Sequence, residues 1–368
     1  MSDESAWPPR AVCDLHVDTL LEIQGGADLG RGNPEGHVDL ARLRQGGAGL
    51  MVFACFIAST VPSDQAFREA TRLLDELDRT CDRFSAELAK VETAAEAERA
   101  NATGKIAILP AIENGHAIES DVRNLEPLRR RGVRYLTLTH IRHLAWAASS
   151  TEPWTEPHGL QPLGREVVAE MERLGILVDL SHVHETTFWD VQKIAKRPLI
   201  ASHSCAAALC PLARNLSDDQ IRAIADSGGM VGINFFPAFL DPSYFADRGG
   251  SPEKFFAGLD AAERTPDPHA RIAARHRAAD RARERFGPAR ANADTIVAHM
   301  RHVIDLVGVD HVGIGSDFDG VLELPADVPD CSAYPHVLDR LAETGLDEAA
   351  IAKVAGRNFL RVLAEVDR

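Results

Sequence analysis

This chain of 368 residues lacks several features that mark particular classes of protein. No stretch approaches the roughly 20 consecutive apolar residues that a membrane-spanning helix needs. The beginning, MSDESAWPPRAV, has no basic segment followed by an apolar one, so we expect no signal peptide. The charged ending LRVLAEVDR is unlike a lipid-anchor signal. These absences predict a protein without a membrane partner.

An excess of positive charge is also missing. Lys and Arg number 40 against 55 Asp and Glu, which gives a formal net charge of -15 at pH 7. Nucleic acids and anionic membranes both require a basic face on the protein that binds them. The charge balance therefore predicts a protein that binds neither.

Cysteine is present but forms no recognisable motif. The six cysteines are scattered without CxxC spacing: Cys13, Cys55, Cys81, Cys205, Cys210 and Cys331. This distribution indicates neither a thiolate metal site nor a disulfide framework. Without a secretion signal, reduced thiols are the better interpretation, and we expect a cytoplasmic protein.

The sequence does contain eight short, mostly β-rich apolar runs. They are AVCDLHVD, LMVFACFI, IAILPAIE, VRYLTLTH, ILVDLSH, PLIASHS, MVGINFF and HVGIGSDF. Near-continuous apolar runs are typical of parallel strands that are covered on both faces. Helical patterns separate most of them, for instance at 63–84, 164–175 and 217–229. The alternation predicts a TIM-like (β/α)8 barrel in a single domain, 1–368, with an open doubly wound sheet as the main alternative.

Residues 241–291 break this alternation with long charged helical stretches such as ARIAARHRAADRARERFG. They follow the seventh apolar run and far exceed the usual connection of a few residues. We interpret the segment as a helical insertion over the active-site end of the barrel. A solvated decoration without functional contacts is the alternative.

Titratable side chains close the apolar runs, where a barrel of this kind carries its active site. They are His16 and Asp18 in the first run, Glu113 in the third, His140 in the fourth, His182 in the fifth, His203 in the sixth and Asp317 in the eighth. Any one histidine could be a core residue bonded to the backbone. Their repetition on several strands instead predicts one shared site. We expect His37, His158, His184 and His299 to make local bonds at the surface.

Imidazole and carboxylate ligands without thiolate suit Zn²⁺ or a related divalent ion, and one carboxylate can bridge two ions. The ligand count fits a pair of ions, with His16, Asp18, His182 and His203 arranged around a shared Glu113. Two other hydrolase arrangements are not favoured. One of them requires a carbamylated lysine at the end of the fourth run, which holds no lysine. The other requires a His-x-His pair in the first run, where position 18 is Asp.

With these residues assembled, the sequence resembles the membrane (renal) dipeptidase family of zinc peptidases over nearly the whole chain. The motifs that carry the resemblance are DLHVD, AIENGHAI, YLTLTH, LGILVDLSHV, IASHS, ARNLSDDQIRAIADSGGMVGINFFP, HVGIGSDFDG and GRNFLRVL. The resemblance implies a TIM-barrel-like fold, two Zn²⁺ per chain and hydrolysis of dipeptides, including those with a C-terminal D-residue. The secretion signal and lipid-anchor tail of animal members are absent, which implies a soluble bacterial-type member. A homodimer is a further expectation from the family.

The resemblance also implies a role for each residue of the site. His16, Asp18 and Glu113 would hold one zinc, and Glu113, His182 and His203 the other. His140 matches the histidine that contacts the substrate and steadies the tetrahedral intermediate. Asp317 matches the acid that exchanges protons at the reacting centre, and Arg214 matches the arginine that binds the free carboxylate of the substrate. The segment after Phe236 departs from the family, so we assign no substrate contacts there.

Fold and metal ions alone do not fix the substrate. One alternative is a metal-dependent hydrolase that acts on a non-peptide amide or a lactone. Another is a catalytically silent metal-binding or scaffold protein. Arg214 favours a substrate with a carboxylate, and the complete set of ligands together with Asp317 favours an enzyme.

Overall fold

In the computed structural model, which describes residues 7–152, 155–265 and 267–367, nine strands form one parallel sheet. The strands are β1 (Val12–Val17), β2 (Ala48–Phe56), β3 (Leu88–Lys90), β4 (Ile106–Glu113), β5 (Tyr135–Thr137), β6 (Leu177–Asp179), β7 (Leu199–Ser204), β8 (Met230–Ile233) and β9 (Val312–Ile314). Eight of them correspond to the eight apolar runs of the sequence. Their residues are buried almost throughout, as expected for strands covered on both faces.

The sheet closes on itself. Its order is β2-β1-β9-β8-β7-β6-β5-β4-β3, and an additional pairing of β2 with β4 closes eight of the strands into a ring, with β3 paired to β4 outside it. The predicted (β/α)8 barrel is confirmed, and the closure excludes the open doubly wound sheet. Strand β3 was not predicted. It pairs with the first half of β4, at Ile106–Ile108, while β5 pairs with the end of β4, at Ile112 and Glu113.

Helices surround the barrel. In the described residues they are α1 (Thr19–Gln24), α2 (Leu40–Gln45), α3 (Ala66–Arg83), α4 (Ala94–Ala102), α5 (Leu125–Arg130), α6 (Pro162–Leu174), α7 (Glu185–Gln192), α8 (Asp218–Asp226), α9 (Pro237–Leu240), α10 (Tyr244–Asp247), α11 (Pro252–Glu263), α12 (Pro268–Phe286), α13 (Ala293–Val307), α14 (Tyr334–Ala342), α15 (Glu348–Ala352) and α16 (Asn358–Val366). None of these helices is both long and apolar enough to cross a bilayer.

Local sequence explains where two of the predicted helices begin and end. Gly175 ends α6 in the left-handed conformation (φ 69°), which glycine adopts without a steric penalty. Ser217 begins α8 with a capping box, in which its hydroxyl accepts from the Gln220 N–H and the Gln220 side chain accepts from the Ser217 N–H. The turn at Gly175 leads directly into β6, which begins at Leu177.

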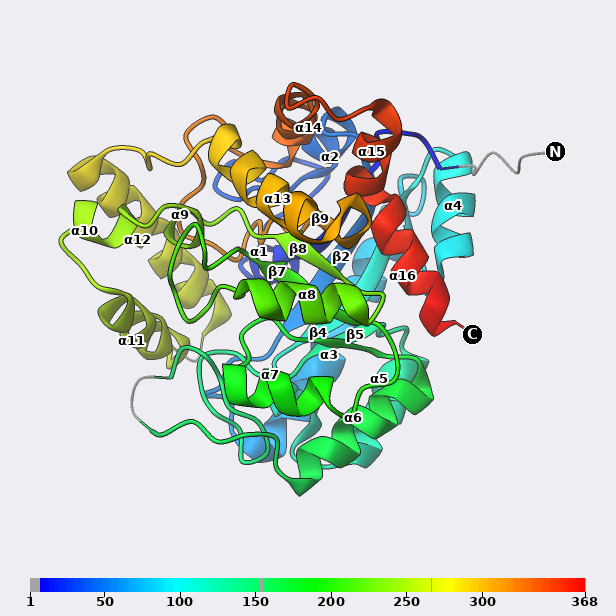
Figure 1. The fold of residues 1–368 in the computed structure, drawn as a ribbon, viewed down its shortest axis with the longest axis vertical. Coiled ribbons are helices and arrows are strands. Elements are labelled where there is room, and N and C mark those ends of the chain that lie inside the picture. The colour runs from blue at the N-terminus through cyan, green and yellow to red at the C-terminus, as the bar shows by residue number, and fades with distance from the viewer. Residues whose placement is uncertain (1–6, 153–154, 266, 368) are drawn as a thin grey trace.

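The segment after β8 forms helices α9 to α12 on one side of the barrel, away from α16 and both chain ends (Figure 1). Four phenylalanines anchor it to the barrel. Phe236, which follows β8, packs against Phe255 of α11, and Phe239 of α9 packs against Phe256, with ring centroids 5.5 and 6.4 Å apart. Helix α11 is thereby held above the carboxyl ends of the strands.

Candidate metal centre and active site

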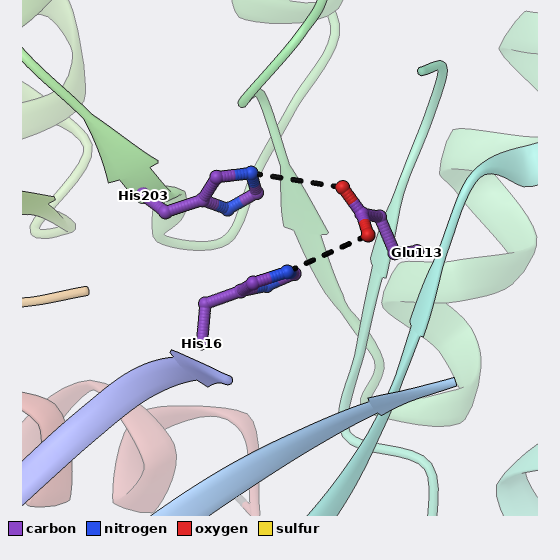
Figure 2. A group of neighbouring side chains, drawn as sticks. All are labelled: His16, Glu113 and His203. Carbon is purple, nitrogen blue, oxygen red and sulfur yellow. Dashed lines mark ion pairs between the residues drawn. The ribbon is translucent and has the colours of Figure 1, made fainter. Parts of the chain in front are cut away.

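Three side chains from separate strands point at one another at the carboxyl end of the barrel. His16 is in β1, Glu113 is the last residue of β4 and His203 is in β7, and all three are buried. Figure 2 shows the two imidazoles aimed at the two oxygens of the Glu113 carboxylate, with His16 Nε2 3.5 Å from Oε2 and His203 Nε2 3.7 Å from Oε1.

Asp18 and His182 extend this group. His182 Nε2 is 3.2 Å from Glu113 Oε1 and 2.9 Å from His203 Nε2. Asp18 follows the end of β1, and its Oδ2 is 3.8 Å from His16 Nε2. Glu113 therefore lies between three imidazoles, those of His16, His182 and His203. This is the position expected for a ligand that two ions share.

Neighbouring hydroxyls fix which ring nitrogen of two histidines is free. The Tyr135 hydroxyl donates to the Leu15 carbonyl (2.8 Å), so it accepts from His16 Nδ1–H (2.7 Å). The Ser202 hydroxyl donates to Asp179 (2.6 Å), so it accepts from His203 Nδ1–H (2.8 Å). In both rings Nε2 therefore faces the site as the nitrogen that a metal ion would bind, which is how metal-binding histidines are held.

The site concentrates the negative charge of Asp18, Glu113 and Asp317 in a small volume. Burial, with Asp18 beside it, raises the pKa of Asp317 to about 7. Burial alone lowers the pKa of His16, but Tyr135 and Glu113 outweigh it and hold that pKa well above its ordinary value. The surroundings of these groups therefore favour a bound cation.

These residues fit one or more divalent cations. His16 Nε2 and Asp18 Oδ1 are buried and have no hydrogen-bond partner among the described residues. Three overlapping groups place their ligand atoms within 4.8 Å of one another: His16, Glu113 and His203; Glu113, His140 and His182; His16, Asp18 and Asp317. Every predicted ligand belongs to at least one group. The groups also include His140 and Asp317, to which the sequence analysis gives other roles.

The loops after β6 and β9 carry two site residues in an unusual backbone conformation. His182 (φ 67°) and Asp317 (φ 63°) each lie three residues beyond the end of a strand, in the last part of the corresponding apolar run. Positive φ is uncommon outside glycine and is typical of functional sites. A Cβ at Gly320 would overlap the carboxylate oxygens of Asp18 and Asp317. Glycine is therefore needed at this position for the close approach of the two carboxylates.

Sequence reasoning missed one residue that contacts His140. Glu263, the last residue of α11, is buried, and its Oε1 lies 3.1 Å from His140 Nδ1 while its Oε2 accepts from the Ser59 N–H (3.0 Å). Burial alone lowers the pKa of His140, but Glu113 and Glu263 outweigh it and the pKa is raised. Nothing in the stretch AAER, within a charged insertion, signals this contact.

Arg214 is buried beside the site and lies beneath the ring of Phe239 (5.3 Å from the guanidinium carbon to the ring centroid). It donates to the Ser204 hydroxyl and to the His203 carbonyl, both at 2.8 Å. No carboxylate of the described residues pairs with it, and its Nε has no partner. Arg214 is therefore a fixed, unneutralised cation next to the metal-ligand candidates, although it does not line the cavity above them.

Two histidines expected to bond at the surface do not. His299 is buried, and it joins α13 to the loop after β7 through the Ala206 N–H and to α9 through the Leu240 carbonyl. His37 contacts Asp319 next to the site, where its Nδ1 accepts from the Asp319 N–H (2.8 Å). Their partners are distant in sequence, so local pattern could not indicate them.

A cavity opens above the site and is closed on one side by the insertion. Its wall includes Asp18, Glu113, His140, His182 and Asp317 from the barrel, and Phe255, Leu259 and Glu263 from α11. Segment 241–291 therefore contributes directly to the space in which a substrate would lie, so it is more than a solvated decoration.

Comparisons with known proteins agree with this geometry. Residues 9–368 match the membrane dipeptidase family, peptidase family M19. The chain is 30% identical over 366 residues to the dipeptidase tcpJ of Claviceps purpurea, which covers 97% of this chain and 74% of that protein.

Two solved structures are similar over almost their whole length. One is a metallo peptidase from Rhodobacter sphaeroides, liganded with a phosphinate mimic of the dipeptide L-Ala-D-Ala (27% identity, 97% of this chain and 99% of that one, TM-score 0.79). The other is the dipeptidase AC, a metallo peptidase of family M19 (28% identity, 98% and 99%, TM-score 0.79). By these matches the chain is a metallo-dipeptidase and belongs to the membrane dipeptidase family.

Proposed function

We propose that the protein is a binuclear zinc dipeptidase. His16, Asp18 and Glu113 would hold one ion, and Glu113, His182 and His203 the other, with Glu113 shared between them. The observation that carries the proposal is the convergence of three imidazole Nε2 atoms on the two oxygens of Glu113. Zinc suits this donor set of imidazoles and carboxylates without thiolate.

Bound divalent ions would polarise the peptide carbonyl and lower the pKa of a water molecule so that it can attack at neutral pH. The chain's own groups would then manage protons and charge. Asp317, with a pKa raised to about 7 by burial and Asp18, is suited to take a proton from the attacking water and return it to the departing amine. His140, with its raised pKa, would donate from Nε2 to the developing oxyanion.

Arg214 would bind the free carboxylate at the C-terminal end of the dipeptide. Its guanidinium is unneutralised and fixed by two hydrogen bonds, and the planar fork suits a carboxylate. Its position beneath Phe239 means that this ring would have to move aside on binding. A clamp on the free carboxylate limits the substrate to short peptides. The ligand of the Rhodobacter sphaeroides relative supports the inclusion of dipeptides with a C-terminal D-residue.

The test is a combined measurement of metal content and hydrolysis of L,L- and L,D-dipeptides. Purified protein should contain two zinc ions per chain, lose activity on chelation and regain it with zinc. Glu113→Gln should lose both ions, whereas Asp18→Asn should lose chiefly one. Glu22→Gln is the matched control, because Glu22 is also buried but bonds to His276 outside the ligand groups. Two retained ions in Glu113→Gln would refute the shared-ligand arrangement.

The cellular location and assembly remain predictions. All six cysteines are buried and unpaired, which supports a reducing compartment such as the cytoplasm. The homodimer expected from the family is tested by the mass of the protein in solution.

A further inference from the structure

Helix α12 of the insertion brings two arginines to the wall of the active-site cavity. Arg271 and Arg275 are one helical turn apart and therefore lie on the same face of the helix. Both line the cavity whose floor contains Glu113 and Asp317. Both are half-buried, whereas Arg277 on the same helix is exposed.

Neither arginine is neutralised by a side chain in the described part of the chain. Arg275 donates to the backbone carbonyl of Asp319 (2.8 Å), which holds the guanidinium in place without cancelling its charge. Burial lowers the pKa of Arg271, so this cation is partly removed from water. A cation that is partly desolvated and unpaired favours an anionic partner.

The acids whose charges act on these arginines, Glu263 and Glu69 on Arg271 and Asp319 on Arg275, are already engaged. Asp319 accepts from the Thr19 hydroxyl and from the His37 N–H. Glu263 contacts His140 and the Ser59 N–H. Glu69 pairs with Arg72 at 2.6 Å. The two guanidiniums are therefore free to meet a group that enters the cavity.

We propose that Arg271 and Arg275 bind a carboxylate on the substrate side chain, so that the preferred substrates are dipeptides containing Asp or Glu. The inference rests on the proposed dipeptidase function and adds the substrate class. Guanidinium groups suit carboxylates because their donors form a planar fork. Apart from the acids and histidines of the site, the cavity wall is largely apolar, with Phe255, Leu259 and Val321 among its residues, so it offers few other cationic partners for an acidic side chain. The net charge of -15 opposes an acidic ligand only weakly, because salt screens the charges that lie more than about 8 Å from the ligand.

The experiment compares pairs of dipeptides that differ only in charge: Ala-Glu with Ala-Gln, and Glu-Ala with Gln-Ala, each with an L or a D C-terminal residue. The zinc-loaded protein should cleave the acidic member of at least one pair with a kcat/KM about 10- to 100-fold higher, the range of one charge-assisted hydrogen bond. Arg271→Gln and Arg275→Gln should each remove most of this preference through KM and leave the amide member unchanged. Arg277→Gln, which alters an exposed arginine of the same helix, should keep the preference.

Two outcomes would overturn the inference. One is an enzyme that cleaves acidic and amide dipeptides equally well. The other is an equal loss on both members of a pair in the variants, which would mean that the arginines bind the free carboxylate common to every dipeptide. Failure of the proposed function looks different, because then no dipeptide in the panel is cleaved. Thermal unfolding of each variant checks that it is folded.

Discussion

The imidazole of His140 is held between two carboxylates that come from different parts of the chain. Glu263 of α11 lies 3.1 Å from Nδ1, and Glu113 of β4 lies 3.8 Å from Nε2. A carboxylate on Nδ1 orients the ring and stabilises its protonated form, in which Nε2 also carries a hydrogen. Glu263 is thus a positioning residue for the hydrogen bond that we assign to His140.

Removal of Glu263 should therefore reduce turnover more than substrate binding. We expect Glu263→Ala to lower kcat about 10- to 100-fold, the usual cost of losing an oriented partner, with little change in KM. Glu263→Gln should recover part of the loss, since an amide oxygen can still accept from Nδ1–H. Steady-state kinetics on a neutral dipeptide measures both values.

The control for this prediction is Asp260→Asn on the same helix. Asp260 pairs with Arg142 and Arg264 and does not touch His140, so its loss reports only a looser attachment of α11. If Asp260→Asn reduced kcat as much as Glu263→Ala, the effect would come from the helix and not from His140.

At the scale of elements, the sequence pattern predicted most of the fold. It predicted which residues gather at the site, but not the backbone conformations and one of the contacts that hold them there. Apolar runs and caps such as Gly175 are local signals, and they located eight strands and three of the helices between them. Strand β3 has three residues and no apolar run, so it gave no signal. The left-handed backbone at His182 and Asp317 and the reach of Glu263 depend on tertiary contacts, which a local pattern does not contain. The roles of the site residues stay predictions until they are tested.

His299 provides a testable link between elements. Its Nδ1 accepts from the Ala206 N–H (3.1 Å) and its Nε2–H donates to the Leu240 carbonyl (3.0 Å), so the ring is neutral and joins α13 to two neighbours. Burial lowers its pKa below the ordinary value near 6.5. Below about pH 6.5 the unfolded chain therefore binds a proton that the folded chain does not, and stability falls as the pH falls.

We expect His299→Gln to lose less stability than the natural chain between pH 7 and pH 5, by about 1 kcal/mol, because glutamine keeps a donor and an acceptor but does not titrate in this range. Urea unfolding at several pH values measures the difference. The control, His336→Gln, removes a surface histidine that pairs with Asp327 and measures what the loss of such a histidine does to the same curve. Parallel curves for His299→Gln and the natural chain would contradict the assignment.

At the scale of the whole molecule, three acidic residues lie together at the carboxyl end of the barrel. Asp18, Glu113 and Asp317 are far apart in the sequence, yet all three are buried around one point. Such a cluster opposes folding unless its charge is compensated. Stability and metal binding should therefore be coupled across the molecule, since a cation that binds only the folded chain favours that state.

Chelation should lower the melting temperature of the entire domain. When free zinc exceeds its Kd by 1,000-fold, binding adds about 4 kcal/mol to the free energy of unfolding, which corresponds to a shift on the order of 5–10 °C for a protein of this size. Calorimetry of chelated protein, before and after zinc is restored, measures the shift. Glu113→Gln should respond weakly to zinc, because it lacks the carboxylate around which the three imidazoles converge. A natural chain whose melting temperature does not change on chelation and reloading would show that the buried acids are stabilised by something other than a metal ion.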